Sequence, residues 1–445
     1  MTAALPPALP GTALRILATS DLGASTVPLP TSDGESGTCA GIVALLEREP
    51  QPAIWLEAGD LVVGNPSYPL LRERPWGEIA DLPIAAAAVG NHDFDDGVEA
   101  LRAAARRLTF PLLCANVDVG LPASAMIETA AGPVGVIGLT HPQVDQLTSA
   151  PVPDAGWRER VAPLAAELRR DGARVVVALL HDGVEWWPDG PVGMRPDRLD
   201  GVAQPWAGEV DVIVAGHNFA AWTGTLGGTP AGEPHLFASS VLVIDVTVRP
   251  VVRGVFRVPP VRPARDSAAV RAIDAAGARV VGQLPEVWLT RTGAPRYLPN
   301  LLARALHSAT GADAALVLPG FHGIQAPFDG TVAALGGGPV TELDVLRLFG
   351  QPDYPLAVAE LRPGELEAAA EAYWRDADPR NASGDDLAWN WCRMPAGTSV
   401  GADPPATVAV VAGVVPRLSD WLGREVAAEP ASVTGIDALI GLVSR

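Results

Sequence analysis

The chain has 445 residues, of which 48% are hydrophobic, and its 51 acidic and 32 basic side chains leave a net charge of −19. This length predicts two domains, the hydrophobic content excludes a disordered chain, and the acidic balance argues against a general nucleic-acid-binding protein, which needs a basic surface. A small anionic substrate remains compatible with the acidic chain, because the local charge of a site decides what binds there.

The cysteines and the apolar segments of the chain indicate the cellular compartment that we expect. Cys39, Cys114 and Cys392 are far apart and form no Cys-x-x-Cys pair, which is typical of reduced thiols. The first residues contain no positively charged segment followed by an apolar run, and no run reaches the roughly 18 residues that cross a bilayer. We therefore expect a cytoplasmic protein that acts on a small molecule and contacts neither nucleic acid nor membrane, with its oligomeric state left open.

Short apolar runs alternate with helical patterns through residues 1–255, which we predict to be the first domain. Such alternation predicts an α/β layered fold. In chain order we expect a strand at Leu14–Thr19, a helix at Cys39–Arg48, a strand at Ala53–Glu57, a helix at Gly97–Arg107, and strands at Val134–Leu139, Arg174–Leu180, Val210–Ala215 and Val241–Val248.

A Pro- and Arg-rich stretch follows, and residues 256–284 are predicted to connect two domains, with a helix over 266–281. Residues 285–445 are then the second domain. Its expected elements are a helix at Leu298–His307, a strand at Ala314–Leu318, a Gly-rich loop at Leu335–Gly338, a helix at Glu342–Leu348 and a strand at Leu356–Glu360.

Polar residues follow five apolar runs of the first domain directly, where an open α/β sheet presents its ligands. A single buried histidine after a strand is usually a core residue, but five such motifs in order indicate a metal centre. Mixed carboxylate, amide and imidazole groups suit manganese, zinc, iron or cobalt. The motifs are TSD ending at Asp21, EAGD ending at Asp60, GNHDFDDG around Asn91, LLHDG around His181 and AGHN around His217.

The order of these motifs resembles that of the calcineurin-like metallophosphoesterases, and GNHDFDDG with the later PLLCANV is similar to the bacterial 5′-nucleotidase/UDP-sugar hydrolase family. The likeness covers most of residues 14–250. It implies a four-layer αββα sandwich followed by an α+β 5′-nucleotidase-type substrate domain.

The resemblance also implies roles for individual residues. It assigns one metal position to Asp60, Asn91, His181 and His217, and a second to Asp21 with Asp60 as the bridge. A metal at such a position provides Lewis acidity and a water of low pKa. His92 matches the histidine that stabilises the phosphoryl transition state and leaving group, and Asp95 matches the carboxylate that orients it.

Two positions depart from the family pattern. Gly23 stands where the opening motif has a histidine ligand, and Phe219 stands where the last motif ends in a polar ligand. Neither side chain can bind a metal, and both losses fall on the second metal position. We therefore expect one well-formed metal site, with the second ion left uncertain.

The substrate pocket is also altered. Gln325 replaces the arginine that faces the nucleotide in the family, and His322 lies in the same loop. Trp186 and Trp222 follow two of the metal motifs and are candidates for an aromatic wall, with ordinary packing as the alternative. The prediction is a metal-dependent hydrolase of a phosphoester, or related ester, of a small molecule; the alternatives are a mononuclear enzyme of different chemistry and a non-catalytic binding protein.

Overall fold

The computed structural model divides the chain into two compact units, residues 1–271 with 328–331 and residues 272–327 with 332–445. The division falls within the predicted connector. The structure describes residues 5–31, 34–63, 67–148, 151–152, 160–184, 196–264, 266–289, 298–317, 334–349, 354–362 and 406–445, and, in short stretches, 296, 364–366, 368–369, 372 and 391–392.

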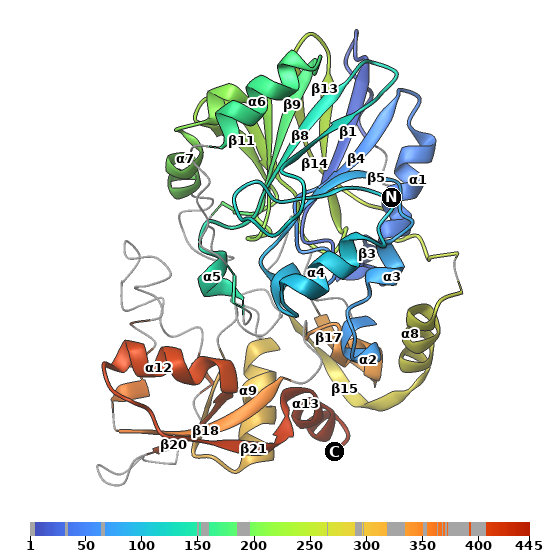
Figure 1. Cartoon of the computed structure of the whole chain (residues 1–445). Coiled ribbons are helices and arrows are strands. Elements are labelled where there is room, and N and C mark those ends of the chain that lie inside the picture. The colour runs from blue at the N-terminus through green and yellow to red at the C-terminus, as the bar shows by residue number, and fades with distance from the viewer. Residues whose placement is uncertain are drawn as a thin grey trace. The chain divides into compact units, whose positions relative to one another are not determined.

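The first unit contains two six-stranded sheets (Figure 1). The first sheet has the order β14 (Pro250–Arg257), β13 (Ser240–Val246), β1 (Leu14–Thr19), β4 (Ala53–Glu57), β5 (Ile84–Ala88) and β6 (Leu112–Leu113). The second has the order β11 (Trp222–Leu226), β12 (Thr229–Glu233), β10 (Val212–Ala215), β9 (Val175–Leu180), β8 (Val134–Leu139) and β7 (Ser124–Ile127).

Side-chain alternation along the strands explains why the sheets stack. In β1, Leu14, Ile16 and Ala18 belong to a buried cluster that also takes Val175 and Val177 of β9. Because successive side chains point to opposite faces of a strand, the residues between them face the other way, toward helices. Each sheet therefore buries both of its faces.

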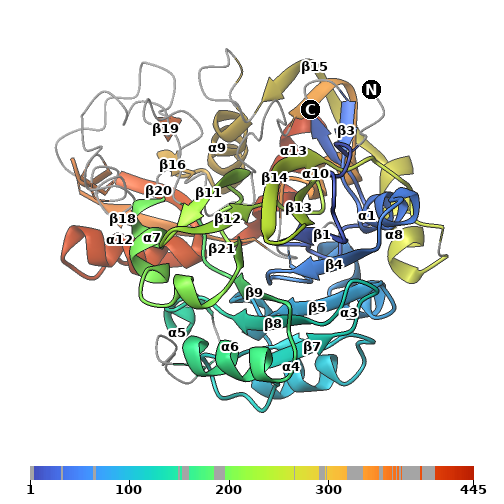
Figure 2. The same cartoon turned by 90° about the horizontal axis from the view of Figure 1, so that it is seen from above.

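Helices cover the two outer faces (Figure 1). The helices α1 (Cys39–Arg48) and α4 (Val98–Ala105) pack on the first sheet, and α6 (Val161–Arg170) and α7 (Asp197–Ala203) pack on the second. Figure 2 shows α6 over the outer side of β8 from a second direction. The unit is thus the expected four-layer αββα sandwich, and its predicted strands and helices end within two residues of the observed bounds.

Short elements complete the first unit. Among the described residues they are the hairpin β2 (Leu29–Thr31) and β3 (Gly34–Ser36), the helices α2 (Ser67–Leu71), α3 (Trp76–Ile79) and α5 (Val144–Leu147), and the 3-10 turns η1 (His92–Phe94) and η2 (Ala207–Glu209).

The second unit is built on a five-stranded sheet with the order β19 (Trp391–Cys392), β16 (Ala314–Leu316), β20 (Ala406–Val411), β18 (Pro355–Leu361) and β21 (Ala428–Thr434). The helix α12 (Val415–Leu422) buries Leu418 against this sheet. Further helices are α8 (Ala268–Ala278), which spans the division, and α9 (Leu298–Thr310), α10 (Glu342–Leu346) and α13 (Gly435–Val443).

The predicted Gly-rich loop at Leu335–Gly338 is wrong, because these residues lie inside β17 (Ala334–Thr341), which pairs antiparallel with β15 (Val280–Leu289). The register shifts between Leu284 and Val287. A Cβ on Gly336 would lie 2.3 Å from the carbonyl oxygen of Glu286. The glycines are needed here because the backbones of β15 and β17 approach each other closely at a bulge in the strand pair.

Among the helices in the described ranges, none has both the length and the apolar character that a bilayer span requires.

Candidate metal centre

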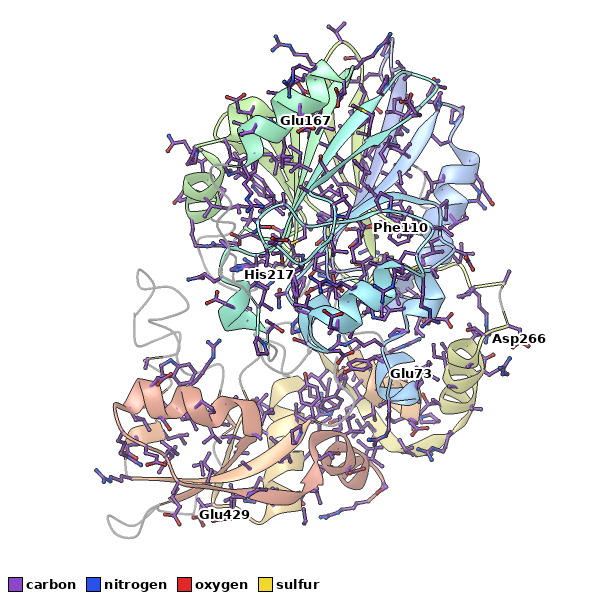
Figure 3. The ribbon with its side chains drawn as sticks, in the orientation of Figure 1. Glu73, Phe110, Glu167, His217, Asp266 and Glu429 are labelled. Atoms are coloured by element: carbon purple, nitrogen blue, oxygen red, sulfur yellow. The ribbon has the colours of Figure 1, made fainter. Side chains whose placement is uncertain are left out.

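The predicted metal ligands meet at one end of the first unit. The strand pairs β1–β4 and β9–β10 are each parallel, so their carboxyl ends lie at the same edge. Asp21, Asp60, His181 and His217 all follow these strands. Figure 3 shows His217 at the end of the strands of this unit.

His181 is oriented as a metal ligand. Its Nδ1 lies 2.9 Å from the carbonyl oxygen of Ala58, which can only accept a hydrogen bond, so Nδ1 carries a proton. Its Nε2 lies 3.2 Å from Oδ1 of Asn91 and 3.3 Å from Oδ2 of Asp60. A backbone carbonyl that holds one ring nitrogen is the usual support for a histidine whose other nitrogen binds metal.

The donor set fits a divalent transition ion. Ligand atoms of Asp60, His181 and His217 lie within 4.8 Å of one another, and the rings of the two histidines are T-shaped with centroids 5.3 Å apart. Asn91, which is 2% exposed, adds its amide oxygen to this group. One carboxylate, one amide and two imidazoles form a mixed oxygen and nitrogen set of the kind that such ions prefer.

The electrostatics of the two histidines differ. Burial, helped by the neighbouring His181 and His141, holds the pKa of His217 well below its usual value, so this ring is neutral, as a ligand must be. Burial would also lower the pKa of His181, but the carboxylates of Asp60 and Asp21 overcome it and raise that pKa to about 10. Without a metal, His181 is therefore an imidazolium, and an ion bound beside Asp60 and Asp21 would take the place of the proton on Nε2.

Asp21 lies at the same edge but is engaged differently. Its Oδ2 accepts the backbone N–H of His217 at 2.8 Å and the hydroxyl of Ser20. Burial and repulsion from Asp60, only partly offset by His181, raise its pKa to about 6. Within the described part of the chain, the three-residue group that fits a metal does not include Asp21.

His92 and Asp95 form the expected pair. Nδ1 of His92 lies 2.9 Å from Oδ2 of Asp95, and the His92 side chain is 38% exposed. The backbone N–H of His92 donates to Oδ1 of Asp60 at 2.9 Å, which ties this residue to the metal group. Burial would lower the pKa of His92, but the carboxylates of Asp60 and Asp95 raise it to about 9.

Two further residues that the sequence did not indicate hold Asp95 in place. Arg74 donates to Oδ2 of Asp95 at 3.2 Å and to the carbonyl oxygen of His92 at 3.1 Å. Thr148 donates to Oδ1 of Asp95 at 3.1 Å. Both come from segments with no recognisable motif, so no sequence signal pointed to them.

Arg74→Ala is expected to lower kcat roughly tenfold, because Asp95 would lose its charged partner and hold the His92 ring less firmly. Metal content should stay unchanged, since Arg74 contacts none of the metal ligands' side chains. Steady-state kinetics with elemental analysis measures both. The exposed Arg106, replaced by alanine, is the matched control; an Arg74 variant as active as that control would remove Arg74 from the site.

Two buried carboxylates shape the loops that carry the ligands. Asp93 accepts the backbone N–H groups of Asp60, Leu61 and Gly90 at 3.1, 3.0 and 2.8 Å. Glu233 in β12 accepts those of Val184, Asn218 and Ala220 at 2.7, 3.1 and 3.2 Å, and so joins the loops after β9 and β10. Asp93 stands inside the GNHDFDDG motif, whereas Glu233 follows no motif.

Gly90→Ala is expected to weaken metal binding at least tenfold and to destabilise the protein by about 2 kcal/mol. A Cβ there would lie 2.1 Å from Oδ1 and 2.2 Å from the backbone N of Asp60, so this ligand must move. Metal titration and thermal unfolding measure the two effects. Gly201→Ala in α7, whose Cβ meets nothing within 4 Å, is the control; equal behaviour of the two variants would contradict the prediction.

The predicted substrate residues are less well placed. Trp222 begins β11 and packs, partly buried, against the cluster beneath α6, and its substrate contact stays a prediction. Trp186, His322 and Gln325 lie outside the described residues.

Comparison with known proteins identifies the first unit. Residues 14–219 match the calcineurin-like phosphoesterase family model. The endonuclease YhcR of Bacillus subtilis is 26% identical over 249 residues, which are 49% of this chain and 20% of that protein. The 2′,3′-cyclic-nucleotide 2′-phosphodiesterase/3′-nucleotidase of Salmonella typhimurium is 24% identical over 319 residues, which are 61% of this chain and 49% of that protein.

A solved structure matches the whole chain. The 5′-nucleotidase precursor from Thermus thermophilus superposes with a TM-score of 0.68 at 18% identity, and the match covers 97% of this chain and 96% of that one. This likeness shows a shared fold. The chain spans about half or less of the length of the curated relatives named above. By its match to the family model over residues 14–219, the first unit belongs to the calcineurin-like phosphoesterases, and the chain as a whole shares its fold with a 5′-nucleotidase precursor.

Proposed function

We propose that the chain is a metal-dependent hydrolase of a phosphoester, or a related ester, of a small molecule. The observation that carries the proposal is the group of Asp60, His181 and His217, whose ligand atoms lie within 4.8 Å of one another, beside the His92–Asp95 pair. These residues, with Asn91, would hold a divalent transition ion, which would supply Lewis acidity and lower the pKa of water.

The protein's own groups supply the rest of the chemistry. His92, with its raised pKa, is an imidazolium at neutral pH and places positive charge where the phosphoryl oxygens become more negative. The same ring can give a proton to the leaving oxygen. Asp95 accepts a hydrogen bond from Nδ1 of His92, so Nε2 of His92 points away from Asp95. Arg74 in turn holds Asp95 in place through its own hydrogen bond.

Two observations support the proposed substrate class. The names of the relatives describe enzymes of nucleotides and nucleic acid, which favours a phosphorylated small molecule. Gln325 stands where the family's nucleotide-facing arginine is expected, which argues against an ordinary nucleoside monophosphate.

A second candidate, a protein that binds metal or ligand without hydrolysis, rests on Gly23 and Phe219, which replace two expected ligands. The retained His92–Asp95 pair favours the hydrolase, because a binding protein needs no proton donor beside its metal.

The test is a phosphatase screen of the metal-free protein reconstituted in turn with manganese, zinc, iron and cobalt. The substrates are p-nitrophenyl phosphate, bis(p-nitrophenyl) phosphate, nucleotides and sugar phosphates. We expect turnover that EDTA abolishes and that His92→Ala lowers. Metal binding with no turnover of any substrate would favour the binding protein, and absence of metal binding would contradict the hydrolase and leave only a protein that binds a ligand without metal.

A further inference from the structure

Gly23 is held against an aromatic ring that fills the space of a side chain. A Cβ on Gly23 would lie 2.7 Å from Cδ1 and 2.8 Å from Cε1 of Phe237, and 2.7 Å from the carbonyl oxygen of Val63. Cβ atoms in proteins do not approach other heavy atoms this closely, so no side chain of any length fits there while Phe237 keeps its place. Phe237 itself is 7% exposed.

The other departing position belongs to the same apolar group. Phe219 packs against Leu236 and Phe237; we call these three residues the apolar plug. The plug's backbone is joined to the loop of Asp21, because the N–H of Phe237 donates to the carbonyl oxygen of Asp21 at 2.8 Å. Gly23, which faces the Phe237 ring, donates its own N–H to the carbonyl oxygen of Asp60 at 3.2 Å. The plug therefore lies beside Asp21, on the side of the missing ligands.

The plug is held firmly. Phe237 and Ala238 have φ angles of 55° and 52°, a left-handed conformation that costs energy for residues with a side chain. The hydroxyl of Ser239 donates to the carbonyl oxygen of Leu236 at 2.6 Å and closes this turn. The neighbouring Leu236 is 1% exposed. A strained turn of this kind persists only where its surroundings determine it.

We propose that Phe237 is the residue that makes this centre mononuclear: its ring, with Phe219 and Leu236, occupies the place of a second metal ion. The donor set at that place does not fit an ion. Asp21 already accepts two hydrogen bonds on Oδ2, Gly23 and Phe219 offer no donor atom, and a desolvated ion against the apolar plug has no compensating ligand. The second metal position is thus lost because the core is packed into it. Restoring a single ligand side chain is therefore not enough to recover that metal position.

The inference rests on the proposed metal function, and a count of bound ions tests it without any turnover measurement. Four metal-free proteins are titrated with Mn²⁺ and dialysed before elemental analysis: the wild type, F219H, F237G and F219H/F237G. F219H offers a ligand with the ring still present, and F237G removes the ring without offering a ligand. Glycine also suits the left-handed backbone at residue 237.

We expect one Mn²⁺ per chain for the wild type and for each single variant, and a second, weaker equivalent for F219H/F237G. A wild type that binds two ions, an F219H protein that gains a second ion with the ring in place, or a double variant that stays at one would each overturn the inference. If the double variant does not fold by circular dichroism, F219H/F237A takes its place. A wild type that binds no ion contradicts the proposed function instead, so the two failures are distinct.

Discussion

His181→Ala is expected to remove the metal ion and to lower turnover at least a thousandfold. Its Nε2 is 3.3 Å from Asp60 and 3.2 Å from Asn91, at the middle of the ligand group. Without this imidazole, Asp60 and Asn91 lose the side chain that both of them approach. A catalytic metal contributes several kcal/mol to transition-state stabilisation, and about 4 kcal/mol corresponds to a thousandfold in rate.

The measurement is metal content by elemental analysis, followed by kcat on the best substrate of the screen. His307→Ala, in α9 of the second unit, is the matched histidine control and should keep both metal and activity. A His181 variant that retained one equivalent of metal at wild-type affinity would show that the ion binds elsewhere.

His92→Ala is expected to lower kcat by roughly 10²- to 10⁴-fold while metal content stays at the wild-type value. The reason is that His92 meets the metal group through its backbone N–H, which alanine retains, while its ring supplies charge and a proton. Removal of the ring therefore separates catalysis from metal binding.

The pH profile gives this prediction a second readout. Because the carboxylates of Asp60 and Asp95 raise the pKa of His92, the wild-type kcat should fall at alkaline pH, where the imidazolium is lost. The variant should lack this alkaline decline and keep only the slower background rate. A variant with an unchanged profile would assign the decline to another group and remove His92 from the chemistry.

The strands and helices predicted in the first unit were found because they carry strong local signals, and their layering was expected from the family resemblance. Runs such as Val134–Leu139 are buried on both faces and read as unbroken apolar strands. The ligand motifs follow these strands directly, so predicting the strands also brought Asp60, His181 and His217 to one edge.

Other features depend on contacts that no local pattern contains. Arg74, Asp93 and Glu233 act on the site through hydrogen bonds to loops distant in sequence, and Phe237 reaches Gly23 across more than two hundred residues. The second unit was predicted less completely. The glycines of β17 were misinterpreted because glycine marks a strand bulge as well as a loop, and only the pairing with β15 distinguishes the two.

The central claim is that one metal ion is held by Asp60, Asn91, His181 and His217. A crystal structure of the manganese-loaded protein, with anomalous difference maps, tests it most directly. The account predicts a single anomalous peak about 2.0–2.2 Å from the ligand atoms of these four residues, as is usual for nitrogen and carboxylate ligands of such ions. A peak of similar height between Asp21 and the ring of Phe237, or none beside His181, would contradict it.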